Sequence, residues 1–285
     1  MSFQDKLLDS FIAFEQVIDL ENPIHTDRKN ALKRFESKGF PTKKDELWKY
    51  TSLKSITQKD YSLSVKSNPN IGLKDIKKYS INDIDSFKIV FVDGVFNPFL
   101  SNTTHDGKDI CVLSAALTKS KYKKTIKKYF NKIVPDDQSL ASLNTSYTQE
   151  GAYIHIPKSV LPEDPVQILH FSSGKNKPLW LQPRNLIIVE ENARVEIIER
   201  HQSLRANDGV TNSLTEIYAE KNSFVDYYKI QNDLETSNLI DNTFIDQQRD
   251  SNVRVHTFSF GGKLTRNNLN FYHKGENIQS TLKGL

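Results

Sequence analysis

Residues 183–285 contain one short pattern of turns and strands that recurs. Small polar turns come every 26 to 30 residues, with β-type segments between them. The four turns are Glu191-Asn192-Ala193, Lys221-Asn222-Ser223, Asp250-Ser251-Asn252 and Gly275-Glu276-Asn277. A fixed period of this size is typical of stacked repeat architectures, because a single unit cannot bury its own apolar face. This repeat limits the possible folds more than any other feature of the chain.

Within the repeated segments, apolar and polar residues alternate. In three segments an apolar pair flanks a polar residue: Val195 and Ile197 around Glu196, Val253 and Val255 around Arg254, and Leu269 and Phe271 around Asn270. Successive side chains of a strand point to opposite faces, so alternation places the apolar members in a core. We therefore predict that the three apolar pairs point inward.

Two all-β architectures fit this pattern. One is an antiparallel meander with hairpins at the turns, and the other is a parallel β-helix that coils in one direction. Tight hairpins favour Asn-Gly or Asp-Gly, and only Asp208-Gly209 offers such a pair in this part of the chain. The segments also keep their length while their side chains vary, which stacked turns tolerate. The pattern favours the β-helix without excluding the meander.

Length and composition indicate a globular protein. The chain has 285 residues, 37% of them hydrophobic and 26% charged, which is enough for one large or two ordinary domains. The sequence contains no apolar run long enough to span a membrane. A net charge of +4 is too small to indicate nucleic-acid binding by itself.

The N-terminal sequence and the cysteine content both favour the cytoplasm. Asp5, Asp9 and Glu15 interrupt any signal-peptide core. The single cysteine, Cys111, excludes an intrachain disulfide framework and suits a reducing compartment. We predict a cytoplasmic protein without a membrane segment.

The first half of the chain is predicted to be helical and mixed. Amphipathic helices are expected over 4–20 and 27–38, and a short helix over 42–50 is expected to wedge Trp48 and Tyr50 between its neighbours. Further elements are expected at 89–92 (strand), 119–132 and 139–149 (helices), and 153–156 and 166–171 (strands). The predicted domains are a helical region over 1–60, a mixed α/β connecting region over 61–150 and a β-helix core over 151–285.

No phosphate-binding loop occurs in the sequence. Neither Gly-x-x-x-x-Gly-Lys-Ser/Thr nor Gly-x-Gly-x-x-Gly is present, and Gly261-Gly262-Lys263 leads into a β pattern instead of a helix. We therefore expect the chain not to bind ATP.

The histidines and the cysteine do not follow a metal-binding spacing. His155, His170, His256 and His273 fall in four different β segments, without a second histidine or cysteine two to four residues away. Stacked turns could still bring some of them together, but packed or surface imidazoles are the favoured interpretation. Cys111 sits among apolar residues and is expected to be a small buried hydrophobe. We assign no catalytic, cofactor-binding or metal-ligating residue.

The segment 119–132 is rich in lysine, with seven lysines among its fourteen residues. Its apolar members Tyr122, Ile126 and Tyr129 fall on one helical face. The lysines are therefore expected to occupy a solvated face, and a nucleic-acid site there is the less favoured interpretation.

Several motifs together give the chain a recognisable family resemblance. They are Phe40-Pro41-Thr42-Lys43-Lys44-Asp45-Glu46-Leu47-Trp48-Lys49-Tyr50-Thr51-Ser52-Leu53, Val92-Asp93-Gly94, Ser142-Leu143-Asn144, Gln182-Pro183-Arg184-Asn185, Gly261-Gly262-Lys263-Leu264-Thr265-Arg266 and Leu282-Lys283-Gly284-Leu285. In this order they resemble the SufD family, scaffold components of the SUF iron–sulfur cluster assembly system. The related SufB family is less similar around Trp48-Lys49-Tyr50.

The resemblance implies a mainly β fold, a right-handed parallel β-helix preceded by helices. It also implies a non-catalytic cytoplasmic scaffold that pairs with a SufB-like paralogue through the β-helices and works with a SufC-type ATPase. Apart from the resemblance, the open C-terminal turn is expected to favour association with another β edge, either that of a second copy of the chain or that of a SufB-like partner. The iron–sulfur cluster would belong to the full complex, and we expect this chain alone to bind no cofactor.

Members of the family continue beyond the Leu282–Leu285 motif, where the resemblance places further turns, a helical domain and the cluster-linked residues. The sequence is therefore expected to be an N-terminal part of a SufD-like protein, and none of those later residues can be assigned here. A polysaccharide-acting β-helix enzyme is the first alternative function, but clustered acidic residues and a secretion signal are not evident. A basic nucleic-acid-binding module using residues 119–132 is the second.

Overall fold

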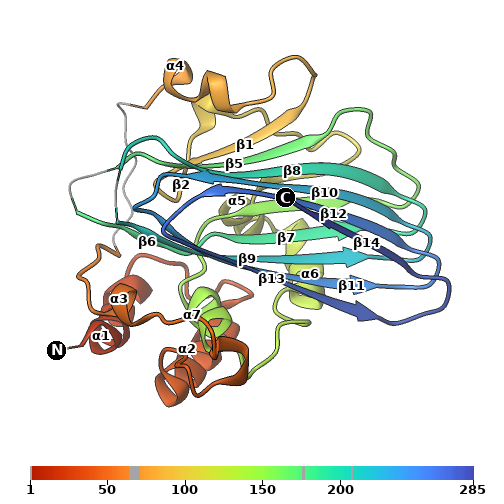
Figure 1. Ribbon diagram of the computed structural model, residues 1–285. Coiled ribbons are helices and arrows are strands. Elements are labelled where there is room, and N and C mark those ends of the chain that lie inside the picture. Colours follow the sequence, from red (N-terminus) through yellow and green to blue (C-terminus); the bar gives the residue numbers. More distant parts are fainter. Residues whose placement is uncertain (1, 64–70, 175–176, 207) are drawn as a thin grey trace.

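The computed structural model describes residues 2–63, 71–174, 177–206 and 208–285. Residues 64–70, within the predicted connecting region, lie outside this part. The chain is mainly β, with a solenoid of about four turns preceded by a helical region (Figure 1). The helices are α1 (Phe3–Glu15), α2 (His25–Lys38), α3 (Lys54–Thr57), α4 (Leu73–Ile76), α5 (Leu113–Thr118), α6 (Ser120–Tyr129) and α7 (Ser139–Ser146), with 3₁₀ turns η1 (Glu46–Trp48), η2 (Lys77–Tyr79) and η3 (Pro98–Leu100). The strands are β1 (Phe87–Val92), β2 (Val95–Phe96), β3 (Asp109–Val112), β4 (Ala152–Ile156), β5 (Val166–Ser172), β6 (Trp180–Leu181), β7 (Arg184–Val189), β8 (Arg194–Ser203), β9 (Val210–Ala219), β10 (Phe224–Asp233), β11 (Asn238–Gln247), β12 (Asn252–Gly261), β13 (Leu264–His273) and β14 (Gln279–Gly284).

The strands form two facing sheets. One has the order β14-β12-β10-β8-β5-β1-β2 and the other β13-β11-β9-β7-β4-β3. From β7 to β14, consecutive strands alternate between the two sheets. Pairing among β7 to β14 is parallel, and Val225 stands in register between Val195 and Val253. Parallel pairing of alternate strands is the signature of a coil, so the solenoid is confirmed and the meander is excluded.

Each recurrent tight turn contains one residue with a left-handed backbone. The φ values are +60° at Asn192, +54° at Asn222, +60° at Asp250 and +55° at Asn277. Asparagine and aspartate tolerate this conformation better than other non-glycine residues, which explains why they recur at these positions. The turns also stack, since the Asn222 side chain donates to that of Asn192 at 2.7 Å. The sequence period thus corresponds to one edge of the solenoid.

The predicted inward residues line the solenoid. Val195, Ile197, Val253 and Val255 are at most 1% exposed and belong to a continuous apolar cluster. Leu269 and Phe271, from the last complete turn, are partly buried and pack against the same cluster. The inside–outside assignment from the alternation is therefore confirmed.

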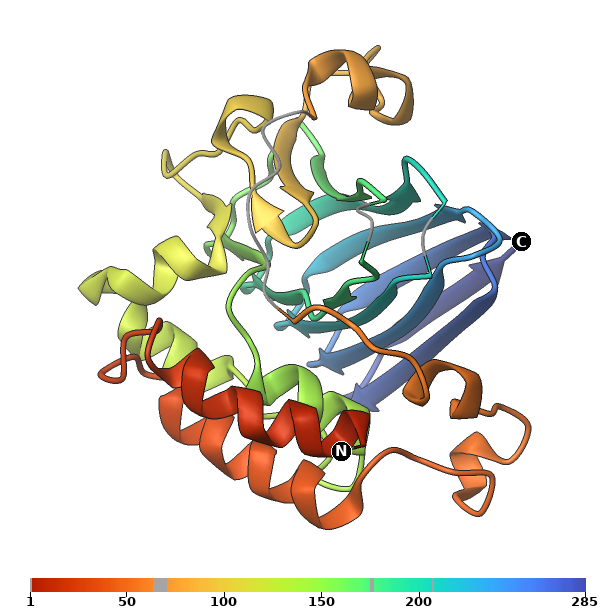
Figure 2. The same ribbon diagram turned by 90° about the vertical axis from the view of Figure 1, so that its left-hand side faces the viewer.

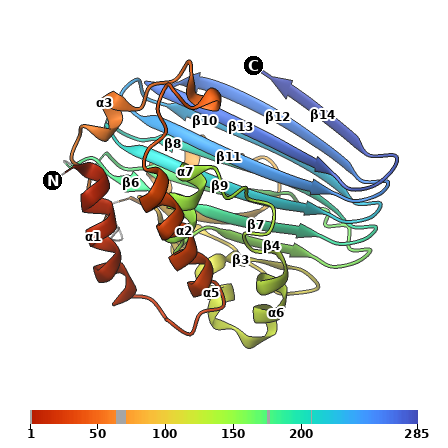
Figure 3. The ribbon, with the colours of Figure 1, turned by 90° about the horizontal axis from the view of Figure 1, so that it is seen from below.

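The longer helices cover the outer face of one sheet, while the short helix α4 packs its Ile76 against β1 and β5 of the other sheet. In α6, Tyr122, Ile126 and Tyr129 are buried against apolar residues of β7, β9 and β11. Helices α1, α2 and α7 pack next to them on the same side, where Leu7 and Phe35 join a cluster with Ile240 of β11. Figures 2 and 3 show these helices gathered along one side of the solenoid. Among the described residues, no helix combines the length and the apolar character that crossing a bilayer requires.

The predicted helix over 42–50 is wrong. Only a single 3₁₀ turn forms, Glu46–Trp48, and Tyr50 is 91% exposed instead of wedged between helices. Two contacts explain the difference. The Asp45 carboxylate accepts from the Thr42 backbone N–H at 2.6 Å, and Arg266 of β13 donates to the Leu47 carbonyl at 2.6 Å. A tertiary contact thus holds this segment in an irregular conformation. Helix α1 also ends at Glu15, earlier than predicted.

Candidate functional site: the polar half of the solenoid interior

Along the strands, the inward-facing residues of the solenoid change from apolar to polar. Next to the tight turns the inward residues are apolar, as in Val195 and Ile197 of β8. Farther along the same strand the inward positions become polar, with Glu199 and His201 only 0% and 6% exposed. The other strands repeat this change. Their polar inward residues, all buried, include His170 of β5, Asn185 of β7, Thr215 of β9, Lys229 of β10 and Asp241 of β11. Buried polar groups need partners, so this half of the interior is the natural place to look for function.

Glu199 is the centre of a buried hydrogen-bond cluster. Its Oε1 accepts from Asn185 Nδ2 at 3.0 Å and lies 3.2 Å from His201 Nε2. Its Oε2 accepts from the Tyr227 hydroxyl. His170 Nε2 lies 3.3 Å from Oε1, but within the described part of the chain it makes no hydrogen bond. The two imidazole rings are stacked, with centroids 4.7 Å apart and planes 10° apart, because His170 and His201 are in register on adjacent strands.

Burial and neighbouring groups set the charges of this cluster. Burial alone would raise the pKa of Glu199, but the proximity of His170 and His201 holds it well below the usual carboxyl range. Burial lowers the pKa of His170. For His201 burial acts in the same direction, yet Glu199 outweighs it and raises the pKa. Burial and Glu199 both raise the pKa of Tyr227, so that its hydroxyl stays protonated and donates. The cluster therefore contains a buried carboxylate and at least one neutral imidazole.

A second buried group lies one turn farther along. Lys229 Nζ of β10 is 2.5 Å from Asp241 Oδ2 and donates to Thr243 Oγ1 at 2.6 Å. Its ammonium also lies 5.3 Å from the Tyr227 ring centroid. Lys229 and Asp241 are at most 5% exposed, so this is a buried ion pair that bridges the two sheets. Asp241 therefore compensates the charge of Lys229.

A small cavity joins the two groups. Its volume is about 10 Å³, close to what one water molecule requires. The lining includes His201, Lys229, Gln231, Asp241, Thr257 and Ser259. These residues come from successive strands, and Ser259 of β12 is exposed.

The structure brings together residues that the sequence kept apart. Of the four histidines considered in the sequence, His170 joins the cluster, but its partners Glu199 and His201 were missed. Once the length of one turn is known, the in-register spacing of His170 and His201 is the signal that could have found them. His155 instead pairs with Glu190 at 2.8 Å.

The other sequence candidates have structural roles. His256 stacks on Tyr228, and His273 is within hydrogen-bond distance of Ser280. Cys111 is 3% exposed, and burial raises its pKa to about 11, so it is the buried hydrophobe that was predicted. Most of the lysine side chains on α6 are exposed, as expected for a solvated helix face.

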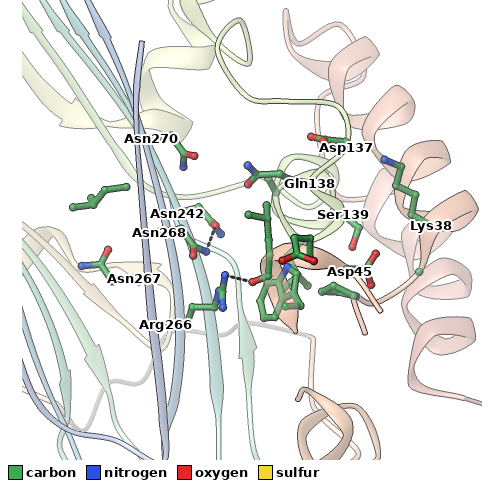
Figure 4. Close-up of a pocket in the computed structure, with 18 residues that line it drawn as sticks. Lys38, Asp45, Asp137, Gln138, Ser139, Asn242, Arg266, Asn267, Asn268 and Asn270 are labelled. Atoms are coloured by element: carbon green, nitrogen blue, oxygen red, sulfur yellow. Dashed lines mark hydrogen bonds between the residues drawn. The ribbon is translucent and has the colours of Figure 1, made fainter. Parts of the chain in front are cut away.

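The motifs quoted for the family resemblance contact one another. The Asn144 side chain donates to the Pro183 carbonyl at 2.9 Å, so the Ser142–Asn144 motif holds the Gln182–Asn185 motif. Arg266 lies 4.3 Å from the Trp48 ring and donates to the Leu47 carbonyl. Figure 4 shows Arg266 reaching from β13 towards this segment, at a surface pocket of about 740 Å³. These motifs therefore attach the helical region to the solenoid.

The fold and its interior define a structural class, a parallel β-solenoid with a helical cover on one outer face. Comparison with family models then places the chain within that class. Residues 1–168 match the SufBD protein N-terminal region, and residues 170–285 match the SufBD core domain of SUF system FeS cluster assembly. The chain belongs to the SufBD family, and its resemblance to SufD is confirmed.

Individual relatives agree with this assignment. A SufBD family protein of iron–sulfur cluster assembly from Synechocystis sp. is 26% identical over 87% of this chain and 56% of its own length. The iron–sulfur cluster assembly protein SufD of Escherichia coli is 24% identical over 86% of this chain and 54% of its own length. The chain thus spans about half the length of these curated relatives.

Proposed function

We propose that this chain is a non-catalytic scaffold subunit for iron–sulfur cluster assembly in the cytoplasm. In this proposal it pairs with a SufB-like subunit and works with a SufC-type ATPase. The observation that carries the proposal is the match of two consecutive regions to the SufBD family, over 1–168 and 170–285. The sequence contains no phosphate-binding loop, which agrees with assigning ATP hydrolysis to a separate subunit.

The chain's own thiol chemistry also supports a scaffold role. An iron–sulfur cluster is held by about four ligands, usually cysteine thiolates. Cys111 is the only cysteine. Its burial raises its pKa to about 11, which disfavours the thiolate that ligation requires. A cluster would therefore need ligands from a partner.

Co-purification tests this proposal. The chain is expressed with a SufB-like paralogue and a SufC-type ATPase from the same genome, and complexes are measured by size exclusion and sedimentation. We expect a stable complex of the chain with both subunits.

Two outcomes would count against the scaffold role. One is failure of the unmodified chain to associate with either subunit. The other is a stoichiometric iron–sulfur cluster that the chain retains alone after anaerobic reconstitution and desalting. We also expect the isolated chain to hydrolyse no ATP.

A further inference from the structure

Three potential metal ligands converge inside the solenoid. His170, Glu199 and His201 each contribute one donor atom, and these atoms all lie within 4.8 Å of one another. Glu199 and His201 point inward two positions apart on β8, while β5 places His170 in register with His201. The parallel ladder fixes all three side chains, so the cluster is built into the fold.

The distances within the cluster match those of a coordination shell. His201 Nε2 and His170 Nε2 lie 3.2 Å and 3.3 Å from Glu199 Oε1. Zinc–nitrogen and zinc–oxygen bonds of about 2.0–2.2 Å in a tetrahedron put neighbouring ligand atoms roughly 3.3 Å apart. The cluster would therefore need little rearrangement to surround one ion.

Hydrogen bonding within the protein leaves the cluster incomplete. Oε1 of Glu199 already accepts from Asn185, with His201 Nε2 also at hydrogen-bond distance. His170 Nε2 is buried and lies in ion-pair contact with the same oxygen at 3.3 Å, yet among the described residues it makes no hydrogen bond. His170 is only 8% exposed, so water compensates little for the missing bond. A metal ion would give this nitrogen a bonding partner.

The local charge also favours a cation. Glu199 is fully buried, and its partners among the described residues are Asn185, Tyr227 and the two histidines, with no lysine or arginine. Lys229 stands opposite Glu199 in the ladder, but its ammonium is bound to Asp241. A buried carboxylate without a cationic partner is unfavourable, and a metal ion would balance it.

We propose that His170, Glu199 and His201 bind one divalent first-row transition metal ion, such as Zn²⁺ or Fe²⁺. Two imidazoles and one carboxylate form a donor set that suits these ions and not Mg²⁺ or Ca²⁺. Asn185 and Tyr227 hold the Glu199 carboxylate in position, as outer partners of metal ligands do.

This site is independent of the proposed role in cluster assembly, because it concerns a single ion on the isolated chain. The competing explanation is a protonated His201 paired with Glu199, which would balance the charge without a metal. The two explanations differ in whether the chain binds a metal ion and in which ligands surround the bound ion.

Metal titration of the purified chain separates them. After chelator treatment and desalting, Co²⁺ and Zn²⁺ are added and measured by visible absorption, elemental analysis and thermal melting. We expect about one ion per chain and a higher melting temperature with Zn²⁺ but not with Mg²⁺. His170→Gln and His201→Gln should each weaken binding by about 100-fold or more, since even outer partners cost 10–100-fold.

His155→Gln is the matched control, because His155 also contacts a carboxylate, that of Glu190, but outside the cluster. It should bind Co²⁺ like the unmodified chain. The proposal is overturned if the unmodified chain keeps no metal, or if His155→Gln loses as much affinity as His170→Gln. It is also overturned if the two ligand variants bind normally.

X-ray absorption of the zinc-loaded, unmodified chain keeps the test decisive if the variants fail to fold. Two imidazole nitrogens with oxygen ligands support the site, and a shell without imidazole overturns it.

Discussion

The buried ion pair between Arg184 and Glu216 should be the costliest polar interaction to break. Both side chains are 0% exposed, and Arg184 Nη2 lies 2.5 Å from Glu216 Oε1 across the adjacent strands β7 and β9. Arg184 also donates to Thr145 of α7 at 2.9 Å, and its guanidinium lies 4.6 Å from the Phe130 ring. The pair therefore joins the solenoid to its helical cover.

Arg184→Met would leave the Glu216 carboxylate buried without a cation. Its remaining partners would be the Asn131 backbone N–H at 2.8 Å and the Tyr218 hydroxyl at 3.3 Å. Removing one member of a buried pair typically costs about 3–5 kcal/mol of folding free energy. We expect the free energy of folding to be reduced by an amount in this range. A similar loss is expected for Glu216→Leu, which leaves the Arg184 guanidinium buried without a counter-ion.

The double variant gives the sharper test. With Arg184→Met and Glu216→Leu combined, neither charge is left uncompensated, so the loss should fall below the sum of the two single losses. We expect the shortfall to reach about 2 kcal/mol, within the range found for contacting residues. Such non-additivity would identify the ion pair as the source of the single-variant effects.

Urea unfolding followed by circular dichroism and tryptophan fluorescence measures these free energies, provided that the two transitions coincide. Lys158→Met is the control, because Lys158 forms an exposed pair with Glu191 at 2.8 Å. Exposed pairs contribute about 0–1 kcal/mol. Single-variant losses no larger than this control, or strictly additive losses, would refute the reasoning.

Three further predictions concern the core, the N-terminal segment and pH. Ile197→Asp should disrupt the solenoid, because burial of the wild-type side chain contributes about 1.5–3 kcal/mol and a charge would replace it. Glu196→Ala should be tolerated. Equal melting temperatures of the two variants would contradict the inside–outside assignment. Trp48→Ala should lower the free energy of unfolding in urea by about 1–2 kcal/mol, because the partly buried ring packs on Arg266. Tyr50→Ala should change it little, because Tyr50 is exposed. Equal effects would argue against the contact between Trp48 and Arg266. Burial raises the pKa of Glu150 from 4.5 to about 7, so the folded protein holds this proton more tightly and its stability falls as pH rises through that interval. Glu150→Gln should remove this dependence, gaining on the order of 2 kcal/mol at about pH 8, after allowance for partial exposure, and nothing at about pH 4; identical pH profiles would show that Glu150 does not titrate this way.

The repeating architecture could be predicted from local sequence patterns. The spacing of the small polar turns and the alternation around Glu196 and Arg254 depend on local backbone preferences, which neighbouring residues express directly. For the same reason the apolar face of α6 and the burial of Cys111 were predictable. The choice between a coil and a meander could not be decided in this way, because the alternation within one strand does not show whether its partner strand runs parallel or antiparallel. The family resemblance favoured the coil, and the parallel pairing decided it.

Contacts between side chains that are distant in the sequence depend on the register of the folded strands. His170 becomes a neighbour of Glu199 and His201 because one turn of the solenoid separates them, and a change of register by one residue would turn them to opposite faces. The segment over 42–50 shows the same limit, since its helical pattern yields to the bond between Arg266 and the Leu47 carbonyl. Local patterns set which faces are apolar, and long-range register sets which polar groups share a site.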